Sequence, residues 1–250
     1  MRSAMRHLFM LYRSLETLPH VPTITVSESS ESLGRVTVDL AGSLTYHSQI
    51  DGFLGYSEEL LDILQQINAA HSPRLCQQTD TSAEADALLG KLNVMISRDT
   101  KTPPGVSISS LSSQSGRDFA LCHQVFQQAT LIHLYRQLYN LPSASESIQA
   151  AVQTINGMVI NMTQGEPCNT WVAMAMPLFT VGCEAYQHDQ KSFILDKIRK
   201  LELCIGSLHV QVIGQALKDI WKIRNDLQDF EGKLCASHLL ERLSYNIVLF

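Results

Sequence analysis

The sequence has no closely spaced cysteines, no glycine-rich phosphate loop and no apolar run of membrane length. Its six cysteines are scattered along the 250 residues, whereas a thiolate zinc site needs pairs that one turn of backbone presents to a single ion. We therefore interpret them as small buried residues in a reducing compartment. A membrane helix needs about 20 apolar residues in succession, so we expect a soluble, intracellular protein.

Basic charge is also scarce. The 19 lysines and arginines are outnumbered by 24 aspartates and glutamates, which gives a net charge of −5. Neutralisation of phosphates supplies most of the affinity of a freestanding nucleic-acid-binding domain, so such domains carry a basic balance or a basic stripe. We therefore expect these residues not to bind nucleic acid directly.

Known catalytic and metal-binding patterns are missing as well. No two histidines have the one-turn helical spacing of metal ligands, and His123 and His133 lie far apart on one predicted helix. There is no Gly-x-Ser-x-Gly elbow for a nucleophilic serine. We expect these histidines in the core or on the surface, and we predict no metal, no cofactor and no enzymatic activity.

What the sequence does contain is the composition of a folded protein, with 45% hydrophobic and 17% charged residues. Residues 1–50 are predicted to form a short N-terminal helix and a Ser-rich, partly disordered connector, with extended segments at 23–26 and 35–40. Residues 51–250 are predicted to form one helical domain.

Helical periodicity recurs throughout that domain. Ser57 is a suitable N-cap for the first helix, followed by Glu58 and Glu59 in its first turn. Apolar stripes of helical period follow in segments 83–94, 118–140, 143–162, 171–185, 193–205, 210–224 and 239–247, with a loop predicted over 97–115. Because no strands alternate with these helices, we expect an all-α fold, an irregular array of antiparallel helix pairs.

Two local features are predicted within this array. Ser143 and Glu146 have the spacing of a capping box, in which each side chain satisfies a free backbone donor of the other residue. Pro177 falls inside the central segment 171–185, where a proline removes a backbone hydrogen bond and clashes one turn back. We therefore expect a proline-kinked central helix.

Four strings of residues carry a family resemblance. Residues 134–139 read Leu-Tyr-Arg-Gln-Leu-Tyr before a proline-marked loop, and residues 176–185 read Met-Pro-Leu-Phe-Thr-Val-Gly-Cys-Glu-Ala. Residues 55–61 read Gly-Tyr-Ser-Glu-Glu-Leu-Leu, and 216–221 end in a tryptophan. This set resembles the fungal-specific transcription factor domain of the second type, the regulatory domain of fungal zinc binuclear cluster transcription factors.

The resemblance implies a helical transcription regulator in the nucleus, or in the nucleus and cytoplasm, that controls a metabolic or secondary-metabolite gene set. Family members normally begin with a cysteine-rich zinc cluster flanked by basic residues, and this sequence contains none. The resemblance therefore implies action through a DNA-binding partner or as a homodimer, with a small-molecule effector as a further option. A fragment of a longer factor, or the same fold used as a biosynthetic cyclase or isomerase, are the alternatives.

Five residues are candidates to line an effector pocket, and they are Trp171, Met174, Pro177, Glu184 and Arg136. Met and Trp adapt to apolar ligands, and a buried carboxylate can act as an acid or base. A structural interpretation stands beside this one. In it Trp171 and Trp221 belong to the core, and Glu184 binds a neighbouring helix or Arg136 to fix the packing.

Overall fold

The computed structural model describes residues 49–52, 54–71, 81–108, 111–164 and 169–243. The N-terminal helix, the Ser-rich connector and the two extended segments predicted from the sequence fall within 1–48, outside these residues. The described part of the chain is a succession of helices, and its β contacts are isolated bridges that join Ile50 to Ser57 and to Val106. The all-α prediction is confirmed.

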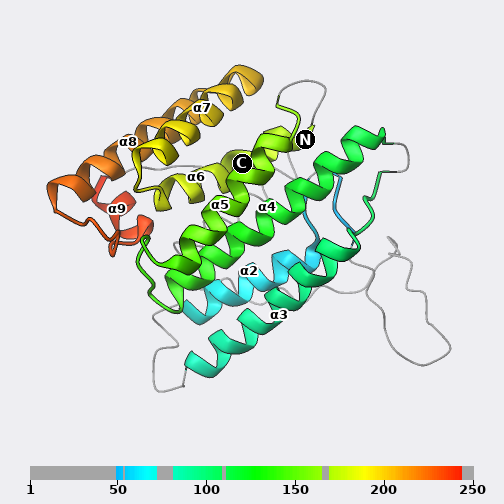
Figure 1. Ribbon diagram of the computed structural model, residues 1–250, viewed down its shortest axis with the longest axis horizontal. Coiled ribbons are helices and arrows are strands. Elements are labelled where there is room, and N and C mark those ends of the chain that lie inside the picture. Colours follow the sequence, from blue (N-terminus) through cyan, green and yellow to red (C-terminus); the bar gives the residue numbers. More distant parts are fainter. Residues whose placement is uncertain (1–48, 53, 72–80, 109–110, 165–168, 244–250) are drawn as a thin grey trace, which may run out of the picture.

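Three helices pack together in the first half of the domain (Figure 1), namely α2 (Glu58–His71), α3 (Thr81–Lys101) and α4 (Ser113–Gln137). The Ser57 hydroxyl accepts a hydrogen bond from the Leu60 amide at 3.4 Å, as its predicted N-cap role requires. The α4 helix begins earlier than predicted, because the Ser112 hydroxyl caps it by accepting from the Ser115 amide at 3.1 Å. The loop predicted over 97–115 is correspondingly shorter.

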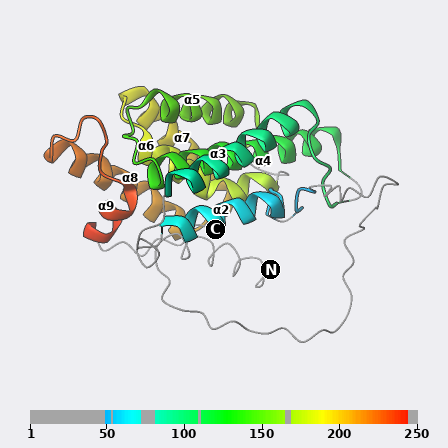
Figure 2. The ribbon, with the colours of Figure 1, turned by 90° about the horizontal axis from the view of Figure 1, so that it is seen from below.

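The second half adds five α-helices and a short 3₁₀ helix. They are α5 (Glu146–Asn161), the 3₁₀ helix η1 (Asn169–Met174), α6 (Ala175–Glu184), α7 (His188–Ile205), α8 (Leu208–Asp226) and α9 (Ala236–Leu243). The α7 and α8 helices form a hairpin, and α6 contacts this hairpin as well as α4 and α5. Figures 1 and 2 show α6 short and central, with longer helices around it.

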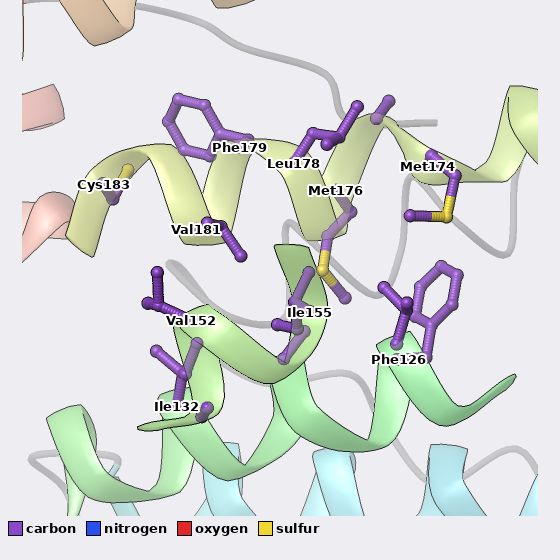
Figure 3. Packing of buried hydrophobic residues seen from close by; sticks show 14 of the residues in the cluster. Phe126, Ile132, Val152, Ile155, Met174, Met176, Leu178, Phe179, Val181 and Cys183 are labelled. Atoms are coloured by element: carbon purple, nitrogen blue, oxygen red, sulfur yellow. The ribbon is translucent and has the colours of Figure 1, made fainter. Parts of the chain in front are cut away.

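Every residue of α6 is buried, which makes it the centre of the core. A helix surrounded by other helices must be apolar on all sides, and α6 is composed almost entirely of apolar residues. Figure 3 shows Met176 and Val181 directed toward Val152 and Ile155 of α5. On another side, a Cβ at Gly182 would lie 2.5 Å from a methyl group of Leu217, so this glycine permits the close approach of α8.

Pro177 stands in the first turn of α6 rather than in the middle of a helix. The chain changes from the 3₁₀ helix η1 to the α-helix between Met174 and Ala175. The first four amides of an α-helix have no partner within it, so the missing N–H of Pro177 costs no hydrogen bond there. The bend angle expected at this proline stays a prediction.

Candidate functional site

The five residues predicted to line a pocket separate into two groups at opposite ends of α6. Trp171 and Met174 belong to η1, before the helix, and both side chains are fully buried. Figure 3 shows Met174 directed toward Phe126 of α4. Glu184 is the last residue of α6, and it meets Arg136 near the end of α4. Trp171 and Met174 thus lie at one end of α6 and Glu184 and Arg136 at the other, and an effector site lined by these residues and Pro177 stays a prediction.

Glu184 and Arg136 form a buried ion pair. Their Oε1 and Nε atoms are 3.3 Å apart, and both side chains are less than one tenth exposed. The other oxygen of Glu184 accepts a hydrogen bond from the Ser143 hydroxyl at 2.5 Å. The predicted packing contact with Arg136 is confirmed. Both carboxylate oxygens have protein partners, which is the arrangement of a structural carboxylate.

The guanidinium of Arg136 also binds two backbone carbonyls. It donates to the Leu141 carbonyl at 2.5 Å and to the Leu234 carbonyl at 2.8 Å. Leu141 lies in the α4–α5 connection and Leu234 in the connection between α8 and α9, 98 positions along the chain from Arg136. Together with its ion pair to Glu184, Arg136 thus ties the end of α6 to the α4–α5 and α8–α9 connections.

The last three carbonyls of α6 each receive a side-chain donor from another helix. Trp221 Nε1 donates to Gly182 at 2.8 Å, Arg224 donates to Cys183, and Gln149 Nε2 donates to Glu184 at 3.1 Å. The final carbonyls of any helix lack partners within it, and leaving them buried and unpaired is costly. These donors therefore allow α6 to end inside the protein.

Arg224, like Arg136, donates to two backbone carbonyls. Besides Cys183, it donates to the same Leu234 carbonyl at 2.9 Å. We call the group of Arg136, Ser143, Gln149, Glu184 and Arg224 the α6-end cluster. Arg136 neutralises the Glu184 carboxylate, the Nε atom of Arg224 lies 3.9 Å from a carboxylate oxygen of Asp229, and both arginines cover helix-end and loop carbonyls.

The capping box predicted for Ser143 and Glu146 is wrong. The N-cap of α5 is Ser145, whose side chain makes no capping hydrogen bond. Ser143 is buried two residues earlier, and its hydroxyl is engaged by Glu184 of α6. The three-residue spacing matches a capping box, but the Ser143 hydroxyl donates to Glu184 instead of capping α5.

A second buried polar cluster lies between α3 and α4 and was not predicted. Asp99 accepts hydrogen bonds from Gln127 Nε2 at 2.6 Å and from Arg98 Nε at 2.7 Å, and His123 Nε2 lies 3.0 Å from the same carboxylate. We call Asp99, His123 and Gln127 the α3–α4 cluster. Burial alone raises the pKa of Asp99, but the hydrogen bonds from His123 and Arg98 outweigh it and hold that pKa below its ordinary value. Asp99 is thus a carboxylate at neutral pH.

Only part of this cluster had a signal in the sequence. His123 and Gln127 are one helical turn apart on α4, but Asp99 comes from a segment that was predicted as loop. His123 is fully buried, and the core was one of the two locations predicted for it. His133 of α4 lies beside Thr180 of α6, with 3.2 Å between its Nε2 atom and the Thr180 hydroxyl oxygen.

The buried thiol next to Glu184 and the possibility of a metal site can also be judged from the structure. Burial, with the neighbouring Glu184 carboxylate, raises the pKa of the Cys183 thiol well above its ordinary value, so this thiol is a poor nucleophile. Among the described residues, no three His, Cys, Asp or Glu side chains are grouped so that they could hold a metal ion. Nor is any helix described here long and apolar enough to cross a bilayer.

Comparison with known proteins gives one match. No curated protein and no solved structure matches the chain. The sequence model of the fungal specific transcription factor domain, however, matches residues 10–249. This span includes every described helix from α2 to α9 and all residues of both polar clusters. The chain therefore belongs to the fungal specific transcription factor domain family, and its role is in the regulation of transcription.

Proposed function

We propose that this chain is the regulatory domain of a nuclear transcription regulator that controls a metabolic or secondary-metabolite gene set. The single observation that carries the proposal is the family match over residues 10–249. The α6-end cluster supports it, because its side chains bind other protein groups and fix helix ends. A fixed helical scaffold suits a domain that acts by binding other molecules.

In this proposal, contact with DNA is made outside these 250 residues, by a DNA-binding protein partner or by an assembly that includes one. The net charge of −5 supports that division of labour, because a protein that neutralises phosphates needs a basic surface. The partner then provides sequence recognition, and this domain provides control.

The test is transcript profiling of a deletion strain together with a survey of its metabolites. We expect a coherent set of genes to change expression, and we expect the wild-type chain, but not an empty vector, to restore it. Steady transcript levels with accumulation of one pathway intermediate would overturn the proposal and favour the enzyme alternative. The Val94→Ala variant is a suitable control, because Val94 is 69% exposed on α3 and its loss disturbs no core contact.

The role of a partner is tested by chromatin immunoprecipitation of the tagged chain. We expect enrichment at promoters of the affected genes, and loss of that enrichment when the DNA-binding partner is depleted. The purified chain alone should show no salt-sensitive binding to those promoter fragments. Tight promoter binding by the purified chain alone would contradict the indirect mechanism while leaving a role in transcription intact.

A further inference from the structure

Two of the six cysteines lie beside the α6-end cluster. Cys183 directly precedes Glu184 at the end of α6 (Figure 3), and it is 2% exposed. Cys235 directly precedes α9, and its carbonyl accepts the first hydrogen bond of that helix from the Leu239 amide at 3.3 Å. Both are free thiols, and Cys235 is only half-buried. The hydrogen bonds of the cluster use the Cys183 carbonyl but neither thiol.

One guanidinium binds the backbone of both cysteine segments. The Nη1 atom of Arg224 donates to the Cys183 carbonyl. Its Nη2 atom donates at 2.9 Å to the Leu234 carbonyl, whose peptide bond leads into Cys235. The two terminal nitrogens belong to one planar group in a fixed fork geometry, so the peptide groups that they bind are neighbours. The end of α6 and the residue before α9 are thus held side by side, although they are far apart in the sequence.

The α8–α9 loop, residues 227–235, fixes the position of Cys235. The Asp229 carboxylate accepts from the Lys233 amide at 2.7 Å and from the Leu234 amide at 3.0 Å, which closes the loop on itself. The Ser143 amide donates to the Gly232 carbonyl at 3.1 Å, which fastens the loop to the α4–α5 connection. Because the loop is already ordered, the approach of the two thiols is set by the fold.

The two thiols are also within electrostatic reach of each other. Burial raises the pKa of the Cys183 thiol most, followed by the Glu184 carboxylate, and Cys235 adds to the rise. Arg224 and Arg136 act in the opposite direction but do not cancel it. A charged group changes the pKa of another only when the two are near neighbours. This interaction agrees with the shared contact of both backbone segments with Arg224.

We propose that Cys183 and Cys235 are a redox-sensitive pair, which hydrogen peroxide converts to a disulfide that joins the end of α6 to the start of α9. Disulfides inside cells are usually transient, and many of them sense oxidants. The disulfide would fasten the α8–α9 loop covalently to the centre of the core. The pair adds a means of control to the proposed function but does not depend on it.

The reaction has two steps, and the more accessible thiol reacts first. The Cys235 thiolate attacks one oxygen of the peroxide, the O–O bond breaks, and a sulfenic acid and hydroxide form. The Cys183 thiolate then attacks the Cys235 sulfur, the S–S bond forms, and the S–O bond breaks to release a second hydroxide. The protons lost by the two thiols convert both hydroxides to water. The cysteine pair loses two electrons, and the peroxide gains them.

The test is peroxide treatment of the purified full chain, followed by proteolysis and mass spectrometry without reductant. We expect peptides joined through Cys183 and Cys235, and their return to free thiols with dithiothreitol. The bond should form faster as the pH rises, because burial raises the pKa of the Cys183 thiol and only its thiolate attacks. The midpoint of thermal unfolding should rise on oxidation, since the bond constrains the unfolded chain.

Matched variants assign the effect to this pair. Cys235→Ser should abolish both the joined peptides and the rise of the midpoint, and circular dichroism checks that the variant is folded. Cys204→Ser is the control, because Cys204 is a half-buried free thiol on α7, and it should abolish neither. Cys235 is itself only half-buried, so the test does not require a substitution at the fully packed Cys183.

Three outcomes would overturn the redox-sensitive pair. The first is oxidation that stops at a sulfenic acid on Cys235, which dimedone traps. The second is a disulfide that joins other cysteines or two chains. The third is a joined peptide with no change in the unfolding midpoint, which would mean that the bond does not fasten α9 to α6 in the folded chain.

The results also separate this proposal from the proposed function. If deletion of the chain changes transcripts but peroxide produces no disulfide between Cys183 and Cys235, the redox-sensitive pair is wrong and the regulatory function stands. If the disulfide forms but deletion changes no transcripts, the regulatory function is wrong and the pair stands.

Discussion

The α3–α4 cluster and the α6-end cluster are both buried and both contain a carboxylate, but they differ in what their polar groups bind. In the α3–α4 cluster, Asp99 is bound by the side chains of His123, Gln127 and Arg98. In the α6-end cluster, the two arginines chiefly bind backbone carbonyls. The first cluster holds one helix against another, whereas the second satisfies chain ends that would otherwise be buried and unpaired.

This difference teaches where substitutions should be costly. A side chain that binds another side chain can be replaced together with its partner, so that no group is left unpaired. A backbone carbonyl is present whatever the residue, so the loss of its donor cannot be offset by a second substitution at the acceptor. The α6-end cluster should therefore tolerate change less well than the α3–α4 cluster.

The largest effect is expected from Arg136→Met. It leaves the Glu184 carboxylate without its cation and removes the donors to Leu141 and Leu234, so we expect a loss of about 3–5 kcal/mol in the free energy of unfolding. Urea unfolding followed by circular dichroism measures it. Lys200→Met, which breaks an exposed pair with Asp196, is the control and should cost under about 0.5 kcal/mol. Equal losses would mean that the buried cluster contributes no more than a surface pair.

Next in size is the contrast between two glycines with positive φ. Gly232→Ala places a Cβ 2.4 Å from Ser143 Oγ, whereas nothing lies within 4 Å of a Cβ at Gly206. Both substitutions incur backbone strain of about 1 kcal/mol, and the clash should raise the loss at Gly232 to about 2–4 kcal/mol. Thermal and urea unfolding of the two variants compare them. Indistinguishable losses would show that the α8–α9 loop does not pack on Ser143 in solution.

The α3–α4 cluster is tested by Asp99→Asn, which should lower the free energy of unfolding by about 2 kcal/mol at neutral pH. The neutral amide oxygen accepts weaker hydrogen bonds than the charged carboxylate does. The pKa of Asp99 is lowered in the folded chain, so its contribution is present above the unfolded value of 3.8 and is lost as the pH falls through the lower folded pKa. Wild type and variant should therefore converge in unfolding free energy below pH 3.8. A gap that stays constant down to the lowest pH would refute the ionised cluster.

The smallest effect at neutral pH is expected from His133, which lies on α4 between the two clusters. Burial lowers the pKa of His133 from 6.5 to about 4. Between these values the unfolded chain binds a proton that the folded chain does not, so stability falls as the pH falls from 6.5 toward 4, by about 3 kcal/mol. His133→Gln should remove this slope in a series of unfolding curves, and His188→Gln, at an exposed position, should leave it in place.

The two pH ranges separate the contribution of His133 from that of Asp99 in the α3–α4 cluster. Loss of stability between pH 6.5 and 4 is assigned to His133, and loss below 3.8 to Asp99. The double variant should show both changes added together, because the two residues act in separate contacts. Failure of additivity would mean that α4 transmits a change at one site to the other.

The sequence by itself determined the helical class, the order of most helices and the burial of the segment around α6. Apolar residues at helical spacing are a local property, and a segment apolar on every side has to lie inside. The strings around Ser57 and Pro177 also carried the family resemblance that the match over residues 10–249 confirms. The predicted contact between Glu184 and Arg136 came from the need of a buried carboxylate for a cation.

Only the tertiary structure decided which polar groups meet. Arg136 binds a carbonyl 98 positions away, and Asp99 lies beside a histidine 24 positions away. The Ser143 hydroxyl donates to Glu184 and does not cap a helix. Such pairings depend on how helices dock, which local periodicity does not encode. The same holds for the positions of Trp171 and Glu184, which belong to one segment of the sequence. The length of a helix places them at opposite ends of α6, because each residue advances the helix by about 1.5 Å.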